Sequence, residues 1–168
     1  MKTVFLPVHP NWLELILSGK KTVEVRKTKP KEAAPFRVIL YCTEDFKNYA
    51  TKTRKNELWI GEPINSLSKG RYIGNGKVIG EFLCDKMYQF IQAGAGIMFA
   101  DENYNLLTPQ TARKMTCLDD KKIDDYLGEK DGYGWHISDL KIYDKPKELS
   151  EFGLKRAPQS WCYVRCEK

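Results

Sequence analysis

A lysine, a glutamate and an arginine lie close together in the segment 19–26, Gly-Lys-Lys-Thr-Val-Glu-Val-Arg. The alternation of its last five residues is typical of a β-strand, in which successive side chains point to opposite faces. Glu24 and Arg26 would then share one face, about 7 Å apart, with Lys21 beside them at the start of the strand. A carboxylate and two cations in this arrangement suit a polar, anionic ligand.

The same three charges have a simpler explanation. On a solvated sheet, Glu24 and Arg26 would only pair with each other or with a neighbouring strand. Because most charged side chains on strands face water, the pattern alone does not distinguish a binding site from an exposed ion pair.

A second group of candidate residues lies near the C-terminus. Trp135 follows a Gly-Tyr-Gly segment, and either its ring or that of Tyr133 could stack a base. His136, Ser138 and, on another predicted strand, Ser160 carry groups that serve in acid–base and nucleophilic chemistry. Simpler roles exist for these residues as well, because His136 can be a structural hydrogen-bonding residue and Ser160 a hydroxyl at a strand edge.

The charge of the chain favours acidic partners, with nucleic acid first among them. The 168 residues carry a net charge of +6, and this length predicts one domain. Six basic residues and one acid between residues 20 and 31 give a local net charge of +5. Six acids and three lysines between residues 119 and 131 give −3, so we expect a basic and an acidic region.

Several classes of protein are disfavoured by the composition. An odd cysteine count and the lack of a signal peptide predict reduced thiols and a cytoplasmic protein. No Cys-x-x-Cys pair occurs and only two histidines are present, so we expect no metal site and no cofactor. No apolar run approaches the 18 residues of a membrane span.

The elements that must position the candidate residues are short and mixed. Hydrophobic periodicity and turn residues predict strands at 3–8, 22–26, 36–43, 76–84, 139–143 and 160–166, and helices at 10–19, 108–115 and 119–127. A small mixed barrel with helices outside fits this order better than a doubly wound parallel sheet. Residues 44–75 interleave basic and aromatic side chains between glycines, and they are interpreted as an insertion, either a nucleic-acid contact or a solvated loop.

The spacing Gly19-x-Lys21-x-x-Glu24-x-Arg26, after a helix that begins His-Pro-x-Trp, resembles the signature of the ASCH domain (activating-signal-cointegrator homology). Gly-Glu-Phe in the strand 76–84, the segment 135–140 and the Pro-Gln-Ser-Trp near the C-terminus also resemble phage and bacterial ASCH proteins. The resemblance covers nearly the whole chain except 44–75. It implies a single ASCH domain over 1–168, with an α+β fold that forms a small PUA-like mixed β-barrel with short helices packed outside.

The resemblance also implies a function. PUA-like domains commonly bind RNA, so we expect RNA or nucleotide binding in a cleft around Lys21, Glu24 and Arg26, joined by Trp135, His136, Ser138 and Ser160. The alternative is a hydrolase, since some small ASCH proteins resemble amidohydrolases of acylated nucleosides and others ribonucleases. Lys21 and Glu24 would then be catalytic. The amidohydrolases carry threonine where this chain has Glu24, which disfavours a covalent threonine route.

Overall fold

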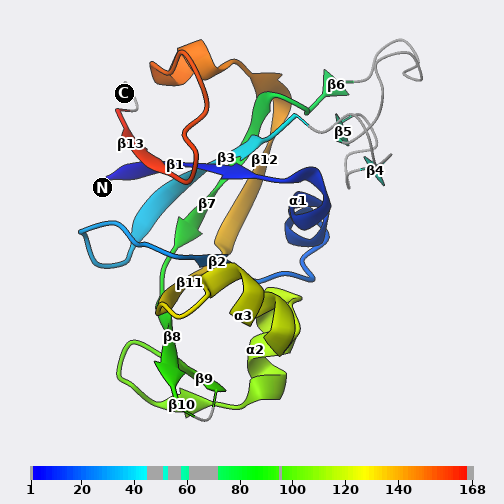
Figure 1. Ribbon diagram of the computed structural model, residues 1–168. Coiled ribbons are helices and arrows are strands. Elements are labelled where there is room, and N and C mark those ends of the chain that lie inside the picture. The colour runs from blue at the N-terminus through cyan, green and yellow to red at the C-terminus, as the bar shows by residue number, and fades with distance from the viewer. Residues whose placement is uncertain (1, 45–50, 53–57, 61–71, 95, 166–168) are drawn as a thin grey trace.

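The computed structural model describes residues 2–44, 51–52, 58–60, 72–94 and 96–165 (Figure 1). A first sheet has the order β12 (Ser138–Lys147), β7 (Lys77–Cys84), β3 (Phe36–Cys42), β1 (Thr3–Val8) and β13 (Cys162–Val164). A second sheet has the order β10 (Leu106–Leu107), β9 (Gly96–Ala100), β8 (Met87–Ala93), β11 (Gly132–His136) and β2 (Val23–Arg26). The helices are α1 (Pro10–Leu17), α2 (Pro109–Thr116), α3 (Asp120–Leu127) and the 3-10 helix Leu149–Phe152.

One long antiparallel pair of strands passes from the first sheet into the second. The chain runs from β7 into β8 across residues 85–86, and from β11 into β12 across Ile137. β7 pairs with β12 and β8 pairs with β11, so both partners bend at the same place. The backbone N–H of His136 donates to the Lys86 carbonyl at 3.1 Å, and that of Ile137 donates to the Thr22 carbonyl at 2.8 Å. These bonds hold the start of β2 at the junction.

The predicted α+β class is confirmed, since β1 and β3 are parallel while the other pairs of the two large sheets are antiparallel. The predicted barrel is not confirmed. Within the described residues each large sheet ends in two strands that do not pair with each other, so the sheets stay open. The sheets stay open because the long strand pair bends, which divides its strands between the two sheets.

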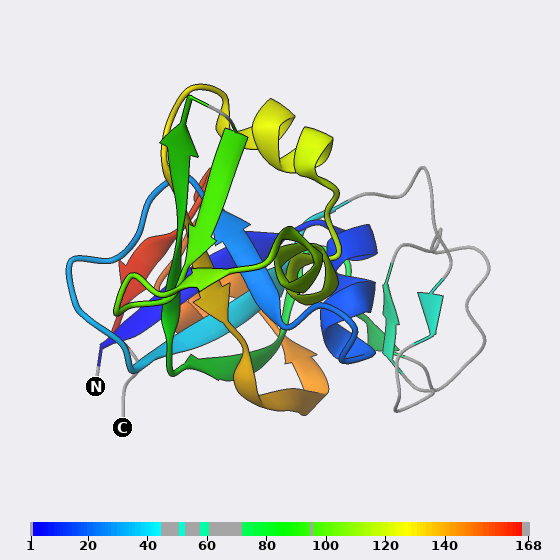
Figure 2. The same ribbon diagram turned by 90° about the horizontal axis from the view of Figure 1, so that it is seen from below.

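Two hydrophobic cores hold the helices against the sheets. Leu13 and Ile16 of α1 pack on the first sheet with Val38 and Phe82. α2 and α3 lie beside the second sheet (Figure 2) and pack on it through six buried residues: Val25, Phe90, Phe99, Ala112, Ile123 and Leu127. β2 therefore lies between two apolar layers.

The six predicted strands and three predicted helices are all present, and the structure adds β8, β9, β10 and β11, which make up most of the second sheet. β9 forms in the glycine-rich segment 93–102, where the local sequence disfavours a strand. The reason is tertiary, because the ring of Phe99 lies 4.7 Å from that of Phe90 and 5.0 Å from that of Tyr88. Thr108 and Asp119 cap α2 and α3 as expected, each accepting a backbone N–H.

Most of the predicted insertion at 44–75 lies outside the described residues. Its described parts include β4 (Thr51–Lys52), β5 (Leu58–Ile60) and β6 (Tyr72–Ile73), which form a small three-stranded sheet. No helix in the described ranges is long and apolar enough to cross a bilayer. The four described cysteines are free thiols, and burial raises the pKa of both Cys42 and Cys84 to about 12.

The close approach of β12 to β7 predicts a strong effect of a methyl group at Gly80. A Cβ there would lie 2.3 Å from the Lys141 carbonyl oxygen, and that oxygen is backbone that cannot rotate away. Gly80→Ala should therefore lower the free energy of unfolding by about 1–3 kcal/mol in urea denaturation. Gly94→Ala is the matched control, because no atom of the described residues, its chain neighbours aside, lies within 4 Å of its Cβ position. Equal effects of the two substitutions would contradict the observed packing.

Candidate functional site

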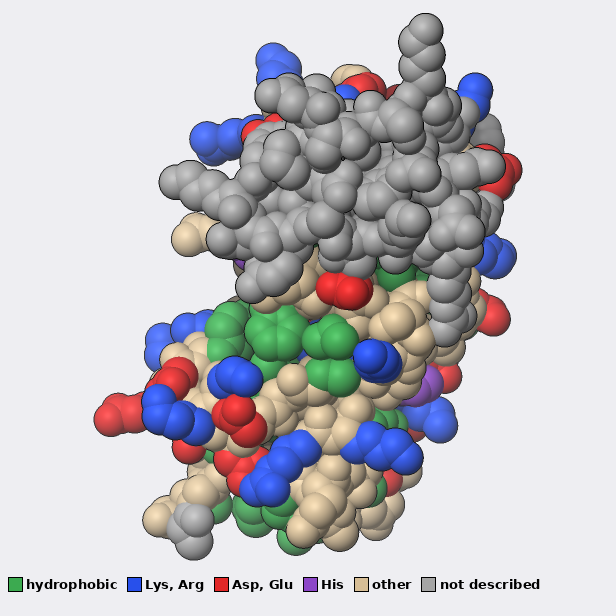
Figure 3. Space-filling model, turned by 90° about the vertical axis from the view of Figure 1, so that its right-hand side faces the viewer, with side chains coloured by type: hydrophobic (Ala, Val, Ile, Leu, Met, Phe, Trp, Pro, Cys, Tyr) green, Lys and Arg blue, Asp and Glu red, His purple; other side chains and the backbone are tan. Residues whose placement is uncertain are grey.

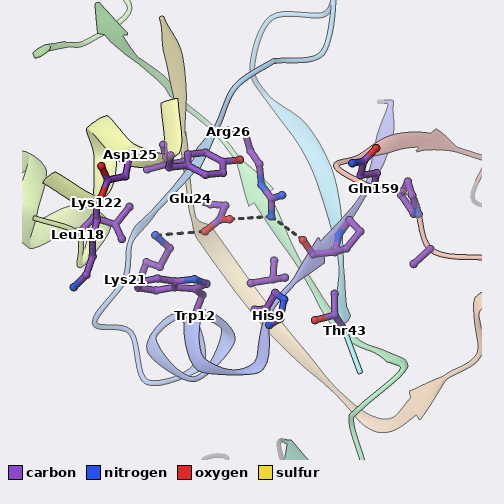
Figure 4. Close-up of a pocket in the computed structure, with 16 residues that line it drawn as sticks. His9, Trp12, Lys21, Glu24, Arg26, Thr43, Leu118, Lys122, Asp125 and Gln159 are labelled. Carbon is purple, nitrogen blue, oxygen red and sulfur yellow. Dashed lines mark hydrogen bonds and ion pairs between the residues drawn. The ribbon is translucent and has the colours of Figure 1, made fainter. Parts of the chain in front are cut away.

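A pocket of about 620 Å³ lies where α1, β2 and α3 meet the turn at residues 157–159 (Figure 4). The lining combines apolar and aromatic side chains with polar and charged ones, which come from separate parts of the chain. It is lined by Pro7, Val8, His9, Trp12, Lys21, Glu24, Val25, Arg26, Thr43, Leu118, Lys122, Asp125, Tyr126, Ala157, Pro158 and Gln159. A pocket of this size that combines apolar walls with polar groups is typical of small-ligand binding.

Strand β2 places its two charged side chains inward. In the register of β2 with β11, Glu24 lies opposite Trp135 and Arg26 opposite Tyr133, so these side chains share the face toward the first sheet. Val25 points the other way, into the core under α2 and α3. The alternation that the sequence predicts is present, but both faces of the strand are covered.

Lys21, Glu24 and Arg26 form a buried chain of charges (Figure 4). The Lys21 Nζ lies 3.4 Å from Glu24 Oε2, and Arg26 Nη2 lies 2.9 Å from Glu24 Oε1. Their side chains are 2%, 8% and 11% exposed, in sequence order. The sequence also allowed Glu24 and Arg26 to form an exposed ion pair, but in the structure both side chains are buried. Two cations around one carboxylate leave the pocket with one net positive charge.

Both cations also hold backbone carbonyls from remote elements. Lys21 Nζ donates to the carbonyl of Thr116 at the end of α2, at 2.7 Å. Arg26 Nη2 donates to the carbonyl of Pro7 in β1, at 2.7 Å. Because a buried charge is stable only when its hydrogen bonds are made, these contacts fix where α2 and β1 lie around the pocket.

Two polar atoms in the pocket wall have no hydrogen-bond partner in the described part of the chain. They are Nε of Arg26 and Oγ1 of Thr43, and both atoms are buried. An unpaired buried polar atom costs about 1–3 kcal/mol, so such atoms call for an explanation. A bound ligand with a suitable acceptor and a second polar group would supply both partners.

Aromatic side chains form two walls of the pocket. Trp12 is partly buried, and Lys21 Nζ lies 5.5 Å from its ring centroid. Tyr126 of α3 forms the other wall. Burial raises the pKa of the Tyr126 hydroxyl, and the nearby Arg26 guanidinium opposes that shift. Both rings line the pocket, so a flat ligand bound there has aromatic surface on which to stack.

The charges at the rim pair among themselves. Lys122 Nζ lies 3.2 Å from an Asp119 carboxylate oxygen, and Lys121 Nζ lies 3.1 Å from an Asp125 oxygen. These four side chains are all more than half exposed, so their pairs contribute little to stability. On the face seen in Figure 3, basic and acidic side chains are mixed around a hydrophobic centre. That face therefore carries no continuous basic surface.

The structure places the second predicted group outside the pocket lining. Trp135 is fully buried, with its ring centroid 5.4 Å from that of Phe36, so it packs in the core and offers no face to a base. His136 Nδ1 lies 2.6 Å from Asp85 Oδ1 at the junction of the sheets. Ser138 donates to the Leu83 carbonyl at 2.8 Å.

Ser160, the remaining predicted residue, follows the lining residues Pro158 and Gln159 but does not line the pocket itself. Of the seven predicted site residues, the pocket thus brings together Lys21, Glu24 and Arg26.

Among the lining residues that sequence reasoning missed are four with polar groups: His9, Thr43, Tyr126 and Gln159. His9 had a signal, because it begins the His-Pro-x-Trp segment that precedes the signature. The other three lie in separate parts of the chain with no motif around them. Among the described residues no group of three or more His, Cys, Asp and Glu side chains is placed to hold a metal ion.

The buried charge chain predicts that Glu24 is essential for folding. Glu24→Gln keeps the shape of the side chain but leaves Lys21 and Arg26 buried without a counter-charge. We expect the free energy of unfolding to fall by about 3–5 kcal/mol in urea denaturation. Asp125→Asn, which breaks an exposed pair, should cost less than about 1 kcal/mol. A small effect of Glu24→Gln would show that the three charges do not depend on one another.

Comparison with known proteins identifies the family. The model of the ASCH domain family matches residues 6–146. The crystal structure of ASCH from Zymomonas mobilis has a TM-score of 0.59 and 18% identity, and the match covers 98% of this chain and 88% of that chain. A tyrosine-to-phenylalanine mutant of that protein gives a TM-score of 0.58 and 19% identity, covering 98% of this chain and 91% of that chain. No curated protein matches the chain.

At these identities the structural likeness shows the fold alone. The family model, in contrast, spans most of the sequence and includes the segment with Lys21, Glu24 and Arg26. The chain therefore belongs to the ASCH domain family, a PUA-like family that is associated in general with RNA binding.

Proposed function

We propose that the pocket binds one nucleotide of a single-stranded RNA. The observation that carries this proposal is the combination in one pocket of a net positive charge, two aromatic walls and two buried polar atoms without partners. The association of the family with RNA supports the choice of ligand. Single strands are favoured over duplexes, because only an unpaired base can leave its stack and enter a pocket.

The size and charge of the pocket fit a nucleotide. A volume of about 620 Å³ lies within the usual range for small-ligand sites. The base would stack between Trp12 and Tyr126, and one phosphate would balance the excess positive charge. Arg26 Nε and the Thr43 hydroxyl would supply the directional hydrogen bonds that select the ligand.

The three charged residues take different parts in this proposal. Arg26 contacts the ligand through its free Nε–H. Glu24 holds the guanidinium in place through Nη2, at 2.9 Å. Lys21 acts through Glu24 and supplies charge, since its ammonium already donates to the Thr116 carbonyl. Lys21 is therefore a positioning residue in the proposal.

The hydrolase alternative has less support. The hydroxyl and imidazole groups expected to help Lys21 and Glu24, at residues 136, 138 and 160, do not line the pocket. Each oxygen of Glu24 already faces a cation, so the carboxylate would have to give up an ion pair to act as a general base. Ligand binding without catalysis leaves both ion pairs of Glu24 in place.

Thr43→Val separates binding from folding. Valine is nearly the same size as threonine but lacks the hydroxyl, so it removes a buried polar atom that has no partner within the described residues. The free energy of unfolding should stay unchanged or rise, whereas affinity for a fluorescein-labelled single-stranded RNA should fall about tenfold. Fluorescence anisotropy and urea denaturation give the two quantities. Substituting Lys21 or Glu24 would change affinity and stability together, because the contacts of both residues also stabilise the fold.

Thr22→Val is the matched control. Thr22 lies directly before the first residue of β2 and does not line the pocket. Its effect on affinity should be less than about twofold. Equal affinities of the Thr43→Val and Thr22→Val variants would overturn the role of the pocket. Failure of the parent protein to bind single-stranded RNA at low salt would overturn the proposed function itself.

A further inference from the structure

We propose that the RNA strand leaves the pocket along a strip of alternating aromatic and basic side chains, so that the site takes a short oligonucleotide instead of a single nucleotide. The strip consists of Tyr126, Lys27, Tyr133 and Lys29. This inference rests on the proposed function and deepens it, because it concerns the part of the ligand outside the pocket.

The four side chains follow one another from the edge of the pocket. Tyr126 lines the pocket, and Lys27 Nζ lies 5.2 Å from its ring centroid. Tyr133 lies opposite Arg26 in the pairing of β2 with β11, and Lys29 Nζ lies 5.0 Å from its ring centroid. The two lysines are exposed, Tyr126 is 39% exposed, and Tyr133 is partly buried against the core of the first sheet. The strip therefore begins at the pocket and reaches solvent.

The charges of the two lysines are available to a ligand. Neither Lys27 nor Lys29 forms a salt bridge with an acid in the described ranges, whereas Lys121 and Lys122 of α3 are both paired with aspartates. Phosphates that follow the bound nucleotide would thus meet unpaired ammonium groups on the side of β2. On the side of α3 they would meet acidic residues. The charge distribution gives the strand one favourable direction out of the pocket.

The loop that carries the lysines is held in place before any ligand arrives. The Thr28 hydroxyl, between the two lysines, accepts a hydrogen bond from Trp161 Nε1 at 2.9 Å. The Lys31 N–H donates to the Tyr163 hydroxyl at 2.9 Å. Glu32 is bound by Lys2 and Tyr163, which hold its carboxyl pKa at about 2. A loop anchored at three successive points loses little conformational freedom when it binds, so its contacts add to affinity.

Alternating aromatic and basic side chains suit a single strand in particular. An ammonium group can contact each phosphate while an aromatic ring stacks on each base, with little regard to sequence. We therefore expect the strip to add affinity and the pocket to add selectivity.

The test compares uridine monophosphate with oligouridylates of two to six nucleotides, using the full chain and isothermal titration calorimetry. Affinity of the parent protein should rise with length over the first few nucleotides and then level off. Lys27→Ala combined with Lys29→Ala should reduce that gain by about tenfold or more, and leave the affinity for the mononucleotide within about twofold. The slope of log affinity against log salt should flatten by about 0.7 for each lost phosphate contact.

The control variant combines Lys114→Ala with Lys141→Ala, which removes the same charge from exposed positions outside the strip. In this variant the affinity should still rise with the length of the oligonucleotide. The strip is overturned if affinity does not rise beyond one nucleotide, or if both double variants lose the same amount, because the lysines then contribute only net charge. These results leave the pocket intact as long as Thr43→Val still weakens the mononucleotide. Absence of mononucleotide binding would instead overturn the proposed function.

Discussion

The burial of two cations around one carboxylate is the constraint on which the rest of the structure depends. Glu24 has Lys21 on one oxygen and Arg26 on the other, and each cation reaches on to a backbone carbonyl of a different element. Charges removed from water must be paired and hydrogen-bonded, so β1, β2 and α2 are restricted to relative positions in which these ion pairs and carbonyl contacts form. The pocket is the space left between elements that are fixed in this way. Its positive charge follows from the count of two cations and one acid.

Much of the fold could be predicted from local sequence, because its elements carry their own signals. Pro10 begins α1, and Thr108 and Asp119 cap the next two helices through their own side chains. What local pattern could not give was the division of strands between two sheets. That division depends on bends at residues 85–86 and 137, which lack the glycines and prolines that usually mark a turn. β9 escaped prediction for a similar reason, since contacts with β8 stabilise a strand in a segment of poor propensity.

The candidate site was predictable only in part. Period-two alternation placed Glu24 and Arg26 on one face, and the spacing of the signature brought in Lys21. Alternation does not say whether a face meets water or another layer of protein, so the burial of all three charges could not be foreseen. Trp135 shares a face with Glu24 in the register with β11, and sequence reasoning placed both at a ligand. The ring extends under the first sheet instead, where Phe36 and Trp161 enclose it.

The contact between Lys21 and the Thr116 carbonyl also has a consequence for how the protein assembles. The last carbonyls of a helix carry partial negative charge and lack partners within the helix. In α2 one of them is satisfied by an ammonium group that lies 95 positions earlier in the chain. The end of this helix is thus completed by a long-range contact, which can form only after β2 has docked. Helix completion and closure of the pocket wall are then one cooperative event, and a chain with a finished α2 already has the charged floor of its site in place.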